Sequence, residues 1–393
     1  MNIRFSERAK LLKPSEIRNK LFDNPEIISF AAGKPEEALF PVEELLPLTY
    51  DVIKFESREA LQYSSTEGYK TFREIIANQR MKAAGVNVTE KNIALTSGSQ
   101  QGIELSARIF INEGDAIICE SPSYVGAFNA FQPYKPKYVG ISIDENGMII
   151  EELEKALKEN SNVKMIYTIP DFQNPTGVCM SDDRRKQLVE LGSKYKVPIV
   201  EDCPYGDLIY EGERHPAVKS FDKDGWVIYL GSFSKIFSPG LRLGWVCASD
   251  EILNKYIFAK QSSDLQCGSI NQKIAGAYMK KYNINKHIGK LRNVYKERRD
   301  VMLDCIKKYF PKNIKHTIPS GGFFVWLELK EDINTNELLI EAAKKAKVAF
   351  VPGSSFFTEE GHNNFIRLSF SHVEKDDIVK GMKRLGNLLQ SYY

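Results

Sequence analysis

The chain has 393 residues, of which 42% are hydrophobic and 27% charged, and its 54 Lys and Arg against 51 Asp and Glu leave a formal charge of +3. This balance creates no single-sign field, so we expect no nucleic-acid partner, and no apolar run approaches the roughly 20 residues of a membrane-spanning helix, so we expect no membrane partner either. At roughly 100–200 residues per domain, the length predicts two or three domains.

Strand-like apolar runs alternate with helix-like segments through the middle of the chain. A helical pattern from Phe72 to Met81 stops at Gly85, and a strand at 93–95 and a helix from about Gln100 follow. Further strands are expected at 116–119, 163–169, 197–200, 226–230 and 243–248, and helices at 151–159 and 181–196, the latter capped by Ser181. This alternation predicts βαβ units and an α/β fold with a mainly parallel sheet.

The pattern changes after about residue 265. A long polar helical stretch at 270–309 is followed by a strand at 323–327, a helix at 335–346, a strand at 365–370 and a closing helix. We therefore expect a smaller α+β domain at 271–393, a large domain at 46–270, and an arm at 1–45 that packs with the small domain.

Cysteine and histidine spacing gives no sign of a metal or of disulfides. The six cysteines include no CxxC pair, and the five histidines include no HExxH motif. The N-terminus carries charges throughout and lacks the apolar stretch of a secretory signal, so we expect a cytoplasmic protein without a metal.

Polar residues follow directly after four of the expected strands. Ligands of open α/β sheets bind outside the carboxyl ends of the strands, so these segments predict a site. They are TSGSQ at 96–100, DFQNPTG at 171–177, EDCPY at 201–205 and GSFSK at 231–235. Neither GxGxxG nor GxxxxGK[ST] occurs, which removes the usual support for a dinucleotide or nucleoside triphosphate.

The segment at 231–235, together with Arg242 seven residues after it, suits a phosphorylated cofactor. Ser232, Ser234 and Arg242 offer hydroxyls and a guanidinium, while Lys235 offers an amine for covalent attachment. The helix expected to begin near Ser99 adds backbone N–H groups for an anion. Taken singly, each feature also has an ordinary reading as a surface lysine, a helix cap or a turn.

The combination is far more specific than its parts. The motifs are NPxG from Asn174, DxxY from Asp202 to Tyr205, SxSK from Ser232 to Lys235, PGxRxG from Pro239 to Gly244, and Arg367. In order and spacing they resemble the fold type I class I/II aminotransferases, which use pyridoxal 5'-phosphate. The resemblance runs from about residue 30 to 375 and is strongest to the 2-aminoadipate and kynurenine aminotransferase group. It implies a central sheet with helices on both faces and a smaller α+β domain.

The resemblance also implies cofactor contacts. Lys235 would form a Schiff base with the cofactor and move the proton as general base and acid, and Asp202 would pair with the protonated pyridine nitrogen. Asn174 and Tyr205 would hydrogen-bond its phenolic oxygen, and Tyr124 would stack on the ring. The phosphate would be held by Ser99, Gln100, Ser232, Ser234 and Arg242, and by Tyr63 of a neighbouring subunit, which implies a homodimer with shared active sites.

The substrate contacts follow from the same comparison. Arg367 would bind the α-carboxylate in a bidentate pair, and Gly33 and Asn174 would line the substrate site. Arg18 matches a mobile arginine near the substrate side chain, although a solvated arm residue fits it almost as well.

We therefore predict a ping-pong aminotransferase of amino-acid metabolism that moves an amino group from an L-amino acid to a 2-oxo acid. The donor could be 2-aminoadipate, glutamate, an aromatic or a branched-chain amino acid. Two alternatives remain open. One is a cofactor-binding effector sensor related to the aminotransferase domain of MocR-type regulators, and the other is a pyridoxal-phosphate-dependent β-lyase.

Overall fold

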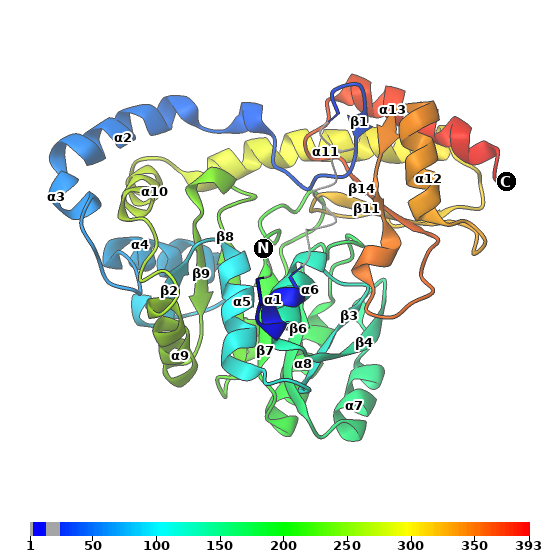
Figure 1. Cartoon of the computed structure of the whole chain (residues 1–393). Coiled ribbons are helices and arrows are strands. Elements are labelled where there is room, and N and C mark those ends of the chain that lie inside the picture. The colour runs from blue at the N-terminus through cyan, green and yellow to red at the C-terminus, as the bar shows by residue number, and fades with distance from the viewer. Residues whose placement is uncertain (1–2, 13–23) are drawn as a thin grey trace.

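The computed structural model describes residues 3–12 and 24–393. Figure 1 shows a large layered part and a smaller part beside it, joined along the top by the long helix α11 (Ile284–Tyr309). The predicted fold, a mainly parallel central sheet with a smaller α+β part, is confirmed. Among the described residues, no helix combines the length and apolarity needed to cross a bilayer.

The central sheet has eight strands in the order β2-β9-β8-β7-β6-β3-β4-β5. Strand β9 runs antiparallel to both its neighbours and β5 runs antiparallel to β4, while the other pairs are parallel. The strands are β2 (Ile93–Thr96), β3 (Ala116–Ser121), β4 (Lys137–Asp144), β5 (Gly147–Met148), β6 (Val163–Thr168), β7 (Ile199–Cys203), β8 (Val227–Ser232) and β9 (Gly244–Cys247). Strands β4 and β5, which the sequence did not predict, lie at one edge and carry less apolar side chains than the buried central strands.

Helices cover both faces of this sheet. Successive strand side chains point to opposite faces, so Ile117 packs with helices on one side and Ile118 with helices on the other. The first face carries α5 (Ser99–Phe110), α6 (Val125–Phe131) and α9 (Asp250–Gln261), and the second carries α7 (Ile150–Glu159) and α8 (Asp182–Tyr195). Ser181 precedes α8 as expected, but its side chain makes no capping hydrogen bond, so that detail of the prediction was wrong. Asp182 and Asp183 in the first turn favour this helix end instead.

The stretch expected as one helix at 270–309 is in fact two. Helix α10 (Ser269–Lys281) packs on α2 (Val42–Phe55), α3 (Ser57–Ala60) and α4 (Lys70–Ile75). Helix α4 continues as a wider helical turn to Met81. The chain then turns at Tyr282, and Asn283 starts α11 by accepting a hydrogen bond from the backbone N–H of Asn285. An Asn side chain competes for backbone donors and so favours a new helix start over continuation of the old helix.

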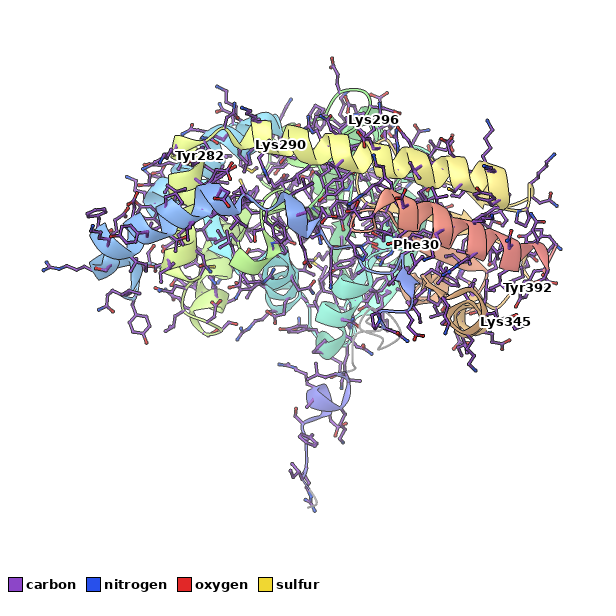
Figure 2. All side chains as sticks on the ribbon, turned by 90° about the horizontal axis from the view of Figure 1, so that it is seen from above. Phe30, Tyr282, Lys290, Lys296, Lys345 and Tyr392 are labelled. Carbon is purple, nitrogen blue, oxygen red and sulfur yellow. The ribbon has the colours of Figure 1, made fainter. Side chains whose placement is uncertain are left out.

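The small part is built on an antiparallel sheet in the order β10-β11-β14-β13. Its strands are β10 (Lys315–His316), β11 (Phe324–Glu328), β13 (Val351–Pro352) and β14 (Phe365–Ser369), and its helices are α12 (Thr335–Glu341), prolonged to Ala346, and α13 (Lys375–Gln390). Figure 2 shows α13 lying along α11, with Phe30 beneath it. A Cβ at Gly381 would meet the Phe30 ring at 2.7 Å, so this glycine lets the ring pack closely on α13.

The N-terminal residues divide between the two parts. Strand β1 (Ile28–Ser29) pairs with β12 (Val348–Ala349) of the small part, whereas α1 (Glu7–Lys10) lies beside residues 132–134 of the large part. The domain limits at 45 and 270 stay a prediction.

Candidate active site

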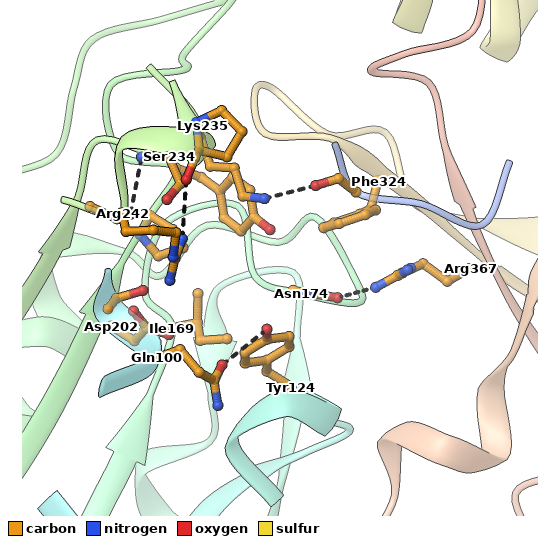
Figure 3. A pocket seen from close by; sticks show the side chains of 16 residues that line it. Gln100, Tyr124, Ile169, Asn174, Asp202, Ser234, Lys235, Arg242, Phe324 and Arg367 are labelled. Carbon is orange, nitrogen blue, oxygen red and sulfur yellow. Dashed lines mark hydrogen bonds between the residues drawn. The ribbon is translucent and has the colours of Figure 1, made fainter. Parts of the chain in front are cut away.

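The carboxyl ends of the parallel strands meet at the edge of the sheet that faces the small part. There they border a cavity of about 260 Å³, drawn in Figure 3. Of the described residues that the sequence predicted for cofactor or substrate, all but Tyr63 line this cavity. The sequence reasoning did not assign roles to four further lining residues, Ile169, Pro204, Pro239 and Phe324. The apolar run at 323–327 predicted that Phe324 lies in a strand, but not that its side chain points into the cavity.

One end of the cavity is built to hold an anion. Helix α5 begins at Ser99, after Gly98 with a φ of 79°, and its free N–H groups and helix dipole favour negative charge. Arg242 lies against this turn and donates hydrogen bonds to the carbonyl oxygens of Ser97 (2.8 Å) and Pro239 (3.3 Å). A Cβ at Gly98 would lie 2.4 Å from the Arg242 guanidinium, so only glycine allows this approach. At the end of β8, the Ser232 hydroxyl accepts a hydrogen bond from the Ser234 N–H.

Gln100 lines the same end, but its side chain is already engaged. The amide nitrogen donates to the Gly126 carbonyl at 2.7 Å, and the amide oxygen accepts from the Tyr124 hydroxyl at 3.4 Å. The side chain therefore connects α5 to α6 and positions Tyr124. The group of Gln100 that can bind an anion is then its backbone N–H.

Lys235 extends into the cavity from the loop after β8. Its Nζ donates a hydrogen bond of 2.8 Å to the Gly33 carbonyl and lies 5.8 Å from the centre of the Phe323 ring. Burial, followed by the positive charges of Arg367 and Arg242, lowers the pKa of Lys235 to about 8, and the Asp202 carboxylate opposes this shift. A large share of this amine is therefore neutral, and so nucleophilic, near pH 8.

Asp202 projects from the end of β7 with one oxygen unused. Its Oδ2 accepts a hydrogen bond of 2.9 Å from the Tyr167 hydroxyl, whereas its Oδ1 is buried and has no partner among the described residues. Burial raises the pKa of Asp202 to about 7, against the lowering effects of Tyr167 and Lys235. An unpaired buried acceptor is costly, so Oδ1 indicates a ligand with a donor at this place.

Arg367 enters the cavity from β14 of the small part and is 1% exposed. It donates to the Asn174 side-chain oxygen at 2.8 Å and to the Ala31 carbonyl at 2.6 Å, and no described carboxylate pairs with it. The guanidinium carbon lies 4.3 Å from the centre of the Phe324 ring. Burial lowers the pKa of Arg367 to about 10, so it stays charged at neutral pH. A buried, unpaired cation with free N–H groups indicates an anionic ligand.

The remaining candidates are placed differently. Tyr205 is buried, with its ring edge-on to Phe323 and Phe324. Tyr63 is 78% exposed and lies outside the cavity of its own chain. Arg18 lies outside the described residues.

Comparison with known proteins identifies the family of the chain. The family profile described as "Aminotransferase class I and II" matches residues 25–385. The chain belongs to this family. It is 43% identical to the aromatic-amino-acid aminotransferase 1 of Thermococcus litoralis, over 98% of this chain and 94% of that protein. This aminotransferase is an enzyme whose cofactor is pyridoxal phosphate, as the sequence motifs predicted.

Solved structures of related aminotransferases have the same fold. The kynurenine aminotransferase of Pyrococcus horikoshii superposes with a TM-score of 0.94 at 40% identity, over 99% of this chain and 97% of that one. LysN, the α-aminoadipate aminotransferase of Thermus thermophilus complexed with N-(5'-phosphopyridoxyl)-L-leucine, gives 0.91 at 35% identity, over 98% and 97%.

The residues of this aminotransferase fit the cofactor on structural grounds. The unpartnered Asp202 Oδ1 is an acceptor suited to a protonated pyridine nitrogen. The start of α5, the hydroxyls of Ser232 and Ser234, and Arg242 form a donor set suited to a phosphate. Lys235 supplies an amine to the same cavity.

Proposed function

We propose that this aminotransferase transfers the amino group of an L-amino acid to a 2-oxo acid in a ping-pong exchange at the cavity around Lys235. The observation that carries the proposal is the convergence of three buried groups from different elements. They are the amine of Lys235, the Oδ1 of Asp202 and the guanidinium of Arg367, and in the described part of the chain this Oδ1 has no donor and this guanidinium no carboxylate.

In this proposal the cavity residues hold the cofactor at both ends. The phosphate is bound by the α5 start at Ser99 and Gln100, by Ser232 and Ser234, and by Arg242. Asp202 accepts a hydrogen bond from the pyridine nitrogen, Asn174 and Tyr205 donate to the phenolic oxygen, and Tyr124 packs against the ring. Arg367 already uses the Asn174 amide oxygen, which leaves the amide nitrogen as the donor. When bound, pyridoxal phosphate supplies an aldehyde that condenses with amines and a ring that withdraws electrons from the substrate Cα.

Arg367 and Lys235 then act on the substrate. Arg367 binds the α-carboxylate through its free N–H groups, while the ring of Phe324 and the Asn174 oxygen keep the guanidinium in place. Lys235 removes the proton from the substrate Cα and then delivers it to the carbon of the cofactor aldehyde group. An amine with a pKa of about 8 is suited to both transfers. Gly33 lines the substrate side and holds the Lys235 amine through its carbonyl.

We propose aromatic amino acids and 2-aminoadipate as the first donors to test. The relatives named above act, by their names, on aromatic amino acids, kynurenine and α-aminoadipate. The aromatic side chains of Tyr124 and Phe324 support an apolar substrate side chain. Glutamate and branched-chain donors belong in the same screen.

We also propose a homodimer in which Tyr63 reaches the phosphate of the partner's site. Support comes from an exposed apolar stripe on α2, formed by Val42, Leu46, Tyr50 and Ile53. The segment that carries Tyr63 lies near the phosphate end of the cavity, because the loop at 262–266 bonds both to Ser64, the neighbour of Tyr63, and to Ser97. In that loop, Gln266 accepts from the Ser64 N–H, and Asp264 accepts from the Ser97 hydroxyl.

The decisive experiment follows the cofactor spectrum during single half-reactions with a panel of donors and 2-oxo acids. A transaminase converts fully to the pyridoxamine form with a good donor and returns with an acceptor. Release of ammonia together with a 2-oxo product would instead support a β-lyase, and binding without turnover across the panel would support an effector sensor. Lys235→Ala should abolish the exchange while leaving phosphate-dependent binding of the cofactor.

A further inference from the structure

Tyr167 is a buried tyrosine that no motif singled out. It lies in β6, where it pairs in register with Val200 of β7. Alternate residues of a strand share a face, so Tyr167 and Asp202 project from the same side of neighbouring strands. This places the phenol diagonally next to the Asp202 carboxylate, and Asp202 lines the cavity whereas Tyr167 does not.

The surroundings of Tyr167 fix the direction of its hydroxyl. The side chain is 0% exposed, and its ring packs edge-on against Phe131 of α6, with centroids 5.5 Å apart at 81°. Burial and the neighbouring Asp202 charge raise the pKa of Tyr167 far above its ordinary value, so the phenol keeps its proton and acts as a donor. It donates to Asp202 Oδ2 at 2.9 Å.

The two oxygens of Asp202 therefore have different tasks. Oδ2 is held by Tyr167, while Oδ1 has no partner among the described residues. A hydrogen bond to a carboxylate stabilises the charged form, and a bond made to one oxygen also fixes the rotation of the group. Lys235 is a second group whose charge favours the Asp202 anion, but it acts from a flexible side chain on the cavity side.

We propose that Tyr167 is a positioning residue that, through Oδ2, turns Asp202 Oδ1 toward the pyridine nitrogen and keeps the proton of that pair on the nitrogen. This rests on the role proposed above for Asp202. Without the phenol, the carboxylate becomes more basic, and the shared proton moves from the nitrogen toward Oδ1. The electron-withdrawing power of the ring depends on that proton, so Tyr167 acts on the reaction without touching cofactor or substrate.

The test uses the full chain loaded with pyridoxal phosphate labelled with nitrogen-15 in the ring, and the readout is the chemical shift of that nitrogen. In Tyr167→Phe the signal should move from the protonated toward the unprotonated value. Affinity for the cofactor should also fall, because Asp202 Oδ1 is no longer held in the direction of the pyridine nitrogen. Site-specific 3-fluorotyrosine at 167, a stronger donor of the same shape, should move the signal in the opposite direction, and it remains informative if the phenylalanine variant does not fold.

Tyr256→Phe is the matched control. The Tyr256 hydroxyl is also buried in the same apolar cluster and bonds the Ser106 hydroxyl at 2.6 Å, away from the cavity. We expect it to lower the unfolding temperature to a similar degree and to leave the nitrogen signal unchanged. A Tyr167→Phe signal that coincides with wild type would overturn the proposal for Tyr167. If Asp202→Asn also left the signal unchanged, the proposed role of Asp202 itself would be wrong.

Discussion

Two residues of the site have an oxygen without a hydrogen-bond donor or a charge without an ion-pair partner among the described residues, which sequence motifs could not have shown. Asp202 has a buried oxygen without a donor, and Arg367 has a buried charge without a carboxylate among the described residues. Either state is costly in a protein without ligand, so both indicate where a ligand binds. In Figure 3 the two residues lie on opposite sides of the cavity, which leaves room for a cofactor ring next to one and a substrate carboxylate next to the other.

At this scale, the charge of Arg367 should control the titration of Lys235. After burial, Arg367 is the largest cause of the lowered pKa of Lys235, about 8. Removing the charge in Arg367→Gln raises that pKa, so the neutral amine forms only at higher pH. The rate of pyridoxal phosphate uptake by cofactor-free protein should rise with pH around 8 in wild type and at clearly higher pH in the variant.

Arg184→Gln is the control for this measurement. Arg184 pairs with Asp144 and does not contribute to the Lys235 shift. Its pH profile of uptake should match wild type. If Arg367→Gln left the midpoint where it is in wild type, the electrostatic account of Lys235 would fail.

At the scale of elements, the loop after β6 holds the two parts of the molecule together beside the cavity. Gly177 has a φ of +75°, and a Cβ there would lie 2.8 Å from the Phe324 carbonyl oxygen and 2.9 Å from Pro319. The same loop carries Asn174, which Arg367 contacts from the small part. The absence of a side chain at Gly177 thus lets the loop after β6 lie close to β11, which helps to bring Asn174 within reach of Arg367.

We expect Gly177→Ala to lower the free energy of unfolding and to weaken substrate binding. The positive φ costs roughly 1–2 kcal/mol for a residue with a Cβ. The contact with the Phe324 backbone adds to that cost, because a carbonyl oxygen cannot yield as a flexible side chain can. Urea denaturation measures the first effect, and the KM for the amino donor measures the second.

Gly212→Ala separates the two causes. Gly212 has a φ of +79° but nothing within 4 Å of an added Cβ. It should therefore show the backbone cost alone, with an unchanged KM. Equal losses of stability in the two variants would mean that the contact with β11 contributes nothing.

At the scale of the whole molecule, the proposed shared sites can be tested by mixing two defective chains. Lys235→Ala lacks the amine, and Tyr63→Ala lacks the phenol proposed to serve the partner. In a mixed dimer, one site combines an intact Lys235 with an intact partner Tyr63, so activity should recover above that of either variant after joint refolding. No recovery would contradict a shared site.

The apolar stripe on α2 gives a second test of the same assembly. Leu46 is 69% exposed, and Leu46→Glu should shift the protein toward monomer because a charge would be buried at the contact. Analytical ultracentrifugation measures the change. Ile340→Glu, on α12 and 51% exposed, is the control and should leave the assembly unchanged. A dimer that persists in Leu46→Glu would place the interface elsewhere.

By itself, the sequence determined the fold class, the family and most of the lining of the cavity. It could do so because strand runs, helical spacing and motifs such as SxSK at Ser232–Lys235 are local, and because the ends of parallel strands meet at one edge of a sheet. It did not separate α10 from α11, because the polar helical pattern continues across the turn at Tyr282. It missed β4, because most side chains of that strand are polar or only half-buried.

Only the tertiary structure decided what each side chain does within that lining. It showed that Gln100 is engaged with α6 and that Arg367 contacts Phe324 and Asn174. It also showed that Tyr167 binds one oxygen of Asp202, whereas the other has no partner in the part of the chain that the structure describes. These contacts join residues from 24 to 193 positions apart, and a sequence contains no local record of which oxygen is satisfied or which charge is left unpaired. Unpaired groups of this kind arise from burial, and burial is a property of the folded chain alone.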